Sequence, residues 1–472
     1  MPSILIKQST IRLQINLVFI ATLALAEFAI PTTANATGLM EAYSAAVAND
    51  SVYRSATHEN EAGQEFKVIG RANLLPNISA NYGYNRNNQD ITAQSNNNTI
   101  SEKRNYTSEN GSVQLRQPIF NLESWARYQQ GNAQTNLSDQ QLEVSKQALI
   151  TRFFGLFASA NYAEDVLALA KAARDGFKLQ EEANKLMAVR GEGTKIALIE
   201  SQAKLSLSEA QVIEAEDNLS DSRNALATML GKDVVALDML TEGFNVLPMQ
   251  PASLEEWKEI ALAHNPEMAA QREAVEVANQ EVKRNRAGHA PRLDAIASIS
   301  NSDSDTTSTF KQNIDTKSIG LQLNIPIYAG GAISALTSQA HARYLKAQDD
   351  LQTKTNEVLL DLRKQFSTLQ SSTLRIDALK QSVASAELLV AATKKSLIGG
   401  VRTNLDVLEA RKQLFETKRD LSLARYNYLV AYINLHKAAG TLSVAELEKI
   451  SPYFVQQARV FKPEDDYYAS VP

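Results

Sequence analysis

The sequence predicts a mainly α-helical protein with a smaller β portion, and three observations support this fold class. Large residues recur at every seventh position near the C-terminus, each followed three positions later by a mostly small residue, as in closely packed coiled coils. The same series occurs 209 residues earlier, so the chain contains two internal repeats. Each repeat also contains two short segments of alternating apolar and polar residues. The large residues are Leu198, Leu205, Val212, Leu219 and Leu226, and then Val407, Leu414, Leu421, Tyr428 and Leu435.

The composition limits the classes of protein that remain. Only 19 Gly and 12 Pro occur in 472 residues, which favours long helices. Cysteine is absent, so disulfides, thiol nucleophiles, cysteine metal sites and a lipid-anchoring cysteine are excluded. The net charge of -5 provides no basic excess for phosphate, and we expect no nucleic-acid partner.

The first 36 residues have the features of a signal peptide. Lys7 and Arg12 precede an apolar run over 17–26, and Ala34 and Ala36 form an A-x-A cleavage motif. We therefore expect cleavage after Ala36 and export from the cytoplasm. A transmembrane anchor is the alternative, but the run is far shorter than the ~20 residues that span a bilayer.

The mature chain divides into repeat 1, residues 37–250, and repeat 2, residues 251–472. Repeat 1 opens with a predicted helix over 39–75, interrupted at 49–51, and repeat 2 has Asn265 and Pro266 at the corresponding place. A proline, Pro76 or Pro291, stops each helix and forces an extended continuation.

Two strands are predicted in each repeat, separated by polar loops at 87–107 and 302–316. Strands of roughly ten residues with one apolar face are what a membrane-spanning β-segment requires, and a soluble sheet with one wet face is the alternative. Four strands cannot close a barrel, and an open edge is not tolerated in lipid, so a membrane barrel would need several chains. The predicted strands lie near 76–87, 109–120, 291–302 and 316–328.

Long helical hairpins follow the strands of each repeat. The runs 121–187 and 332–397 contain no proline, and each predicts a helix of about 100 Å at ~1.5 Å per residue. Short turns lead into return helices over 195–230 and 404–439, which completes antiparallel hairpins over 121–231 and 332–440. The pieces 232–251 and 441–472 are predicted to be irregular with short amphipathic parts, and the tail is predicted to be mobile.

The run from Gly400 through Ala410 to Leu429 and Leu442 is similar to the second-repeat signature of the TolC family of outer-membrane export ducts. The order of elements resembles this family over essentially the whole mature chain. The resemblance implies a homotrimer in the outer membrane, in which four strands per chain form one twelve-stranded β-barrel. It also implies a helical tunnel across the periplasm, a periplasmic adaptor protein and an inner-membrane transporter as partners, contact with outer-membrane lipid, and no cofactor.

The resemblance also implies roles for particular residues. Asp406 and Glu409 match the acidic residues that ring the closed periplasmic tip, and Arg402 with Thr403 matches the polar link that holds the tip shut. Three copies of the acid pair around one axis would repel one another, which favours protonation or a bound divalent cation, although no dedicated metal site is expected. The hairpin turns are expected to dock the adaptor through Gly191, Gly193, Gly399 and Gly400.

Two positions depart from the family pattern, and a third differs between the two repeats. Leu397 stands where members often carry an aromatic residue, so the usual latch is in doubt. Glu409 replaces the more usual Asp, which keeps the charge and extends it by a methylene. Ala197 occupies the first-repeat position that matches Asp406, so only the second repeat supplies the acid pair.

The same residues bear on other functions. An enzyme is disfavoured because the five histidines are scattered, none forms an H-E-x-x-H motif, and 191–195 lacks the spacing of a phosphate loop. A periplasmic coiled-coil scaffold would explain the helices but not the strands. Among ducts, the tip at 190–195 is similar to those that serve type I protein secretion by ABC transporters, and multidrug efflux with a proton-driven pump is the alternative.

Overall fold

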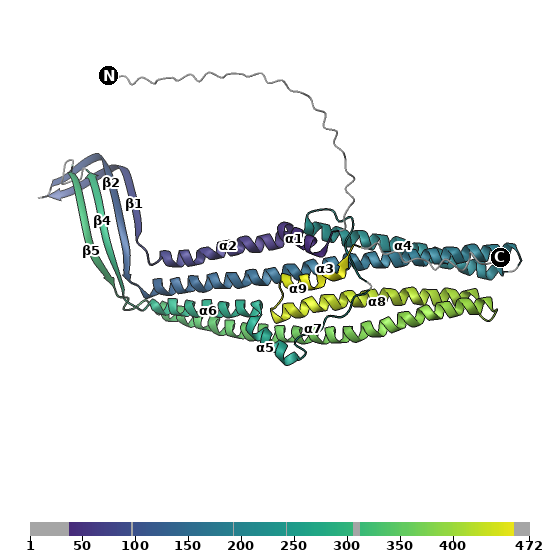
Figure 1. Cartoon of the computed structure of the whole chain (residues 1–472). Helices are drawn as coiled ribbons and strands as arrows, with labels where there is room; N and C mark the ends of the chain where they lie inside the picture. Colours follow the sequence, from purple (N-terminus) through teal and green to yellow (C-terminus); the bar gives the residue numbers. More distant parts are fainter. Residues whose placement is uncertain (1–36, 96–97, 192, 242, 305–311, 457–472) are drawn as a thin grey trace, which may run out of the picture. The chain divides into compact units, whose positions relative to one another are not determined.

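The computed structural model describes residues 37–456 except 96–97, 192, 242 and 305–311 (Figure 1). The predicted signal peptide and the tail from 457 onwards lie outside these residues. Both halves of the chain have the same order of elements, two helices, two strands and two long helices. The fold class predicted from the sequence, mainly α with a β portion, is confirmed.

Each half begins with a broken helix. Helices α1 (Leu39–Asn49) and α2 (Ser51–Ala72) meet at Asp50, whose carboxylate accepts a hydrogen bond from the Tyr53 N–H at 2.7 Å. Helices α5 (Leu254–His264) and α6 (Pro266–Ala287) meet at Asn265, which caps Met268 in the same way at 3.0 Å. These caps satisfy N–H groups that a new helix leaves open, which explains the interruption predicted near residue 50.

The four long strands form one antiparallel sheet in the order β1-β2-β4-β5 (Figure 1). Strands β1 (Asn77–Ser95) and β2 (Asn98–Phe120) are longer than the sequence predicted, and most of the polar loop expected at 87–107 is paired strand. That prediction was wrong because backbone pairing does not depend on apolar side chains, and Asn, Ser and Thr on both faces resemble a loop in sequence.

The second hairpin is shorter. Strand β4 (Arg292–Ser304) runs two residues beyond the predicted end, and β5 (Gln312–Asn324) stops four residues before the predicted end at 328. Pro326 lacks the N–H that a ladder needs, which accounts for the early end of β5. The middle of the predicted loop 302–316 lies outside the described residues.

Strand register gives the sheet one apolar and one polar face. Across β2, β4 and β5, Val113 pairs with Ile299 and Ala297 pairs with Ile319, and Ile78 of β1 pairs with Leu115. The intervening positions along 77–85, 108–118, 292–304 and 312–324 are mostly Asn, Ser, Gln and Thr. The apolar stripe spans about seven residues per strand, roughly 20 Å, which is near the height of the apolar band of outer-membrane barrels.

Three charged side chains lie together on the polar face, at its helix end. Asp294 is 2% exposed and lies 2.5 Å from the Arg116 guanidinium of the neighbouring strand, while Arg292 is 3.4 Å away. The two arginines outnumber the carboxylate, so the cluster carries a net positive charge.

Helix α3 (Leu122–Val189) packs beside both α2 and α6 (Figure 1). Glycine allows the closest approach, because a Cβ added at Gly131 would lie 2.4 Å from the carbonyl oxygen of Phe66. Helix α7 (Ala332–Ile398) packs beside α6, and α4 (Lys195–Leu230) and α8 (Asn404–Ala439) return along α3 and α7 respectively.

The main apolar core lies where these helices meet the connecting segments. Phe153, Phe154 and Phe157 of α3 are fully buried, and Phe454 packs edge-on against the last two. Phe454 belongs to β6 (Phe454–Val455), which follows α9 (Val444–Ile450) and pairs with β3 (Met239–Leu240). The two segments predicted as irregular are thus joined through this pairing. No helix in the described part of the chain combines the length and apolar character that a membrane crossing requires.

Candidate gate at the helical tips

The predicted gate residues lie at the start of α8, beside the turn from α7. Thr403 is the N-cap, and its hydroxyl accepts a hydrogen bond from the Asp406 N–H at 3.3 Å. In return, the Asp406 carboxylate accepts hydrogen bonds from the Thr403 N–H at 2.7 Å and from the Thr403 hydroxyl at 2.8 Å. This reciprocal capping box fixes the Asp406 carboxylate beside the N-terminus of α8.

Arg402 completes this group. Its guanidinium lies 3.3 Å from the Asp406 carboxylate within the same chain, and the two side chains are 60% and 33% exposed. The hydrogen bonds from Thr403, followed by the nearby Arg402 charge, lower the pKa of Asp406. Arg402, Thr403 and Asp406 therefore form one contiguous cluster.

Glu409 faces a different partner. Lys204 of α4 donates a hydrogen bond to the Glu409 carboxylate at 2.7 Å, and this bond lowers the pKa of Glu409. The pair joins the return helix of the first hairpin to that of the second. The acids were expected to favour protonation when three copies crowd together, whereas the contacts within one chain act in the opposite direction.

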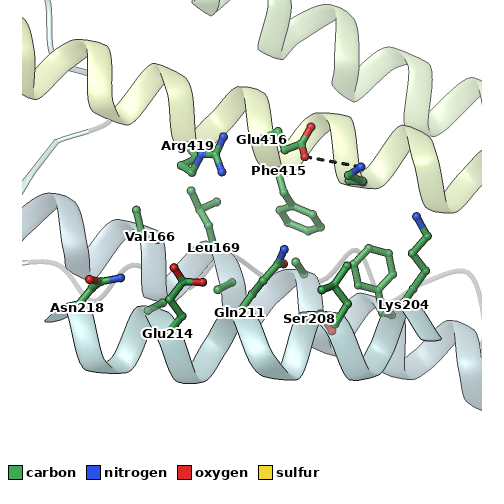
Figure 2. A pocket seen from close by; sticks show the side chains of 16 residues that line it. Val166, Leu169, Lys204, Ser208, Gln211, Glu214, Asn218, Phe415, Glu416 and Arg419 are labelled. Atoms are coloured by element: carbon green, nitrogen blue, oxygen red, sulfur yellow. Dashed lines mark ion pairs between the residues drawn. The ribbon is translucent and has the colours of Figure 1, made fainter. Parts of the chain in front are cut away.

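Below the tip, α8 contacts the first hairpin at further points. Arg411 is buried and directs its guanidinium at the Gly176 carbonyl oxygen of α3, 3.5 Å away. A cavity of about 300 Å³ lies between α3, α4 and α8, with Lys204 and Asn218 at its two ends (Figure 2). Phe415 points from α8 toward the other two helices across this cavity.

The four predicted tip glycines differ in what they require. Gly191 and Gly400 have φ of 77° and 72°, a left-handed conformation that favours glycine. Gly193 lies tightly against Met187, where an added Cβ would meet that side chain at 3.0 Å. Gly399 has φ of -73°, which any residue adopts, so its backbone gives no reason for glycine.

The first-repeat tip lacks the acid cluster. Thr194 caps α4 by accepting a hydrogen bond from the Ala197 N–H at 3.1 Å, but Ala197 has no carboxylate to return it. In the described residues, no group of three or more His, Cys, Asp or Glu side chains has the geometry to hold a metal ion.

Sequence reasoning missed Lys204 and Arg411. Lys204 directly precedes Leu205 of the first heptad series and occupies a g position, but Glu409 lies two residues after Val407 of the second and occupies a c position. Ion pairs between coiled-coil helices usually join e and g positions, so the heptad pattern did not indicate this pair.

Comparison with known proteins settles the family. The family described as outer membrane efflux protein matches residues 42–232 and 257–441. The chain belongs to this family. The resemblance to TolC-type ducts is thereby confirmed, and the protein is an outer-membrane export channel.

Relatives match over most of their length. The alkaline protease secretion protein AprF of Pseudomonas aeruginosa is 38% identical over 89% of this chain and 88% of its own. The proteases secretion protein PrtF of Dickeya chrysanthemi is 36% identical over 89% and 92%. The outer membrane protein TolC of Escherichia coli is 26% identical over 87% and 84%. The outer membrane location expected from the sequence is confirmed by these members.

Solved structures agree on the fold. The Campylobacter jejuni CmeC outer membrane channel matches with a TM-score of 0.75 at 18% identity, over 89% of this chain and 90% of that one. The outer membrane protein VceC of Vibrio cholerae matches with a TM-score of 0.72 at 18% identity, over 85% and 96%.

Proposed function

We propose that three copies of this chain form one export duct, with twelve strands in a shared barrel and the helical hairpins as a periplasmic tunnel. The four-stranded sheet gives this proposal its main support. It has a continuous apolar face, and within one chain β1 and β5 are edge strands. Lipid does not tolerate unpaired backbone groups, so the edges must pair with those of neighbouring copies.

The cargo is proposed to be protein, exported by type I secretion with an inner-membrane ABC transporter and a periplasmic adaptor. Support comes from the two protease secretion proteins, whose identity of 36–38% extends over nearly the full length of each chain. A protease is the cargo class that these names suggest. No catalytic step belongs to the proposed role.

The tip is proposed to be the gate. Asp406 and Glu409 would line its narrowest point, and Arg402 and Thr403 would hold the start of α8 in the closed position. The support is the capping cluster at the start of α8 and the Lys204–Glu409 link between the two hairpins. Opening then requires α8 to move relative to α4.

Two experiments test the assembly and the cargo. In detergent, mass measurement should give three times the mass of the mature chain, and a monomer would contradict the shared barrel. In the native host, deletion of the gene should abolish secretion of a protease into the medium, and the intact gene should restore it. Normal secretion with loss of drug resistance would instead favour the efflux alternative.

Adaptor docking at the hairpin turns is tested by crosslinking. The chain has no cysteine, so a single cysteine at Gly193 or Gly399 is unique. Both should crosslink to the adaptor, whereas a cysteine at the exposed mid-helix Ser371 should not. Equal crosslinking from all three would contradict a special role for the turns.

A further inference from the structure

The two repeats place an arginine at the same point, in the last helical turn before the sheet. Arg71 lies in the last turn of α2 and Arg286 in the last turn of α6. The turns that follow are also alike, because Leu74 N–H bonds to the Arg71 carbonyl at 2.9 Å and His289 N–H bonds to the Arg286 carbonyl at 3.2 Å. Both arginines are exposed.

The nearby acidic side chains pair with other arginines of the same chain. Glu123 pairs with Arg127 at 2.7 Å, and Glu281 pairs with Arg284. Within one chain and among the described residues, neither Arg71 nor Arg286 forms an ion pair, so both guanidinium groups remain available to an anionic ligand.

Helix α3, which lies between α2 and α6, carries two aromatic side chains near the sheet. Helix α3 starts at the sheet and packs against both α2 and α6. Its Trp125 is 52% exposed, and the Trp125 and Tyr128 rings lie 5.7 Å apart. An added Cβ at Gly70 would lie 3.1 Å from the Cα of Tyr128, which brings the turn carrying Arg71 directly against this part of α3.

This arrangement adjoins the apolar face of the sheet. Leu75, four residues after Arg71, is 49% exposed, and Ile78, the second residue of β1, is 67% exposed. Trp and Tyr gather where the apolar part of a bilayer meets the headgroups, and basic side chains beside them reach the phosphates.

We propose that Arg71 and Arg286, on the two helices that flank α3 with its Trp125 and Tyr128, bind the phosphate of anionic phospholipids in the periplasmic leaflet. This inference rests on the proposed placement of the sheet in the outer membrane. It adds that the helix end of the sheet prefers lipids with a negatively charged headgroup. Each arginine near a charged surface favours an anionic lipid by about five-fold in local concentration.

The two tryptophans of the chain make this testable by fluorescence. Trp257 is 2% exposed, so lipid contact quenches only Trp125. The full trimer is reconstituted in phosphatidylethanolamine bilayers that contain a minor fraction of phosphatidylglycerol, with brominated acyl chains on one lipid or the other at equal fraction. Brominated phosphatidylglycerol should quench Trp125 several-fold more than brominated phosphatidylethanolamine, and 1 M salt should reduce the difference.

The variants separate the site from general charge effects. Arg71→Gln with Arg286→Gln should remove the preference, while Arg363→Gln with Arg375→Gln, on an exposed part of α7 remote from the sheet, should keep it. Trp125→Phe should abolish the quenching itself.

Equal quenching by the two lipids in the unmodified protein, or an unchanged preference in the first double variant, would overturn the site. Absence of quenching by either lipid would instead contradict the membrane placement. If the double variant fails to assemble, the lipid comparison in the unmodified protein decides.

Discussion

Lys204 and Glu409 join the two repeats by a hydrogen-bonded ion pair of 2.7 Å between α4 and α8. The side chains are 29% and 50% exposed, so water screens the attraction and one pair contributes little. In a trimer, the contributions of the three equivalent ion pairs to the stability of the closed gate would add together. The pair lies one turn after the capping cluster of Thr403 and Asp406, where a movement of α8 would separate it.

Breaking this pair should favour the open channel. Lys204→Gln or Glu409→Gln is expected to raise the open probability in planar bilayers by up to about five-fold per copy, the upper range for an exposed pair. Lys204→Glu combined with Glu409→Lys should restore the closed state. Lys171→Gln provides a matched control, because Lys171 pairs with Glu216 at 3.0 Å between α3 and α4 without reaching α8. An equal effect of the control would show that general loss of charge, not this link, is responsible.

The tip should lose its contacts only in acid. The pKa values of Asp406 and Glu409 lie below their ordinary values of 3.8 and 4.5, because both carboxylates accept hydrogen bonds. Groups with lowered pKa stabilise the fold above the ordinary values, and this contribution is lost as the pH falls through the lowered values. Channel recordings should show a closed state unchanged from pH 7 to about 5 and increased opening below about 4. Opening already at pH 6 would mean that crowding of the three copies raises the pKa values and outweighs these bonds.

Two glycines of α3 should respond in opposite ways to the same substitution. Gly131→Ala places a Cβ against the Phe66 carbonyl, so α2 must move away, and this should destabilise the trimer by about 1–3 kcal/mol. Gly155→Ala meets no atom within 4 Å and should stabilise it by about 0.5–1 kcal/mol, because alanine loses less backbone entropy in a helix. Thermal unfolding of the purified protein measures both. Equal stability of the two variants would contradict the close packing of α2 on α3.

The helices could be predicted from the sequence, whereas contacts between segments distant in the sequence could not. The heptad series and the breaks at Asp50 and Asn265 are local signals, and they predicted the helices closely. The outer half of the β1–β2 hairpin was missed because its Asn, Ser and Thr residues lack the apolar alternation that marks a strand. The β3–β6 pairing involves two-residue strands whose order comes from the core around Phe454. The Lys204–Glu409 pair joins residues 205 positions apart, a contact that only the packing of the hairpins defines.

The most direct test of the account is the ion selectivity of single channels in planar bilayers after loss of the tip acids. Asp406→Ala with Glu409→Ala should abolish the preference for cations and the block by divalent ions. Asp349→Asn with Asp377→Asn, exposed acids of α7, should change neither property. Arg402→Ser should raise the conductance, because the start of α8 loses its basic partner. If the double tip variant keeps both its cation preference and its divalent block, Asp406 and Glu409 do not form the constriction, and the proposed gate is wrong.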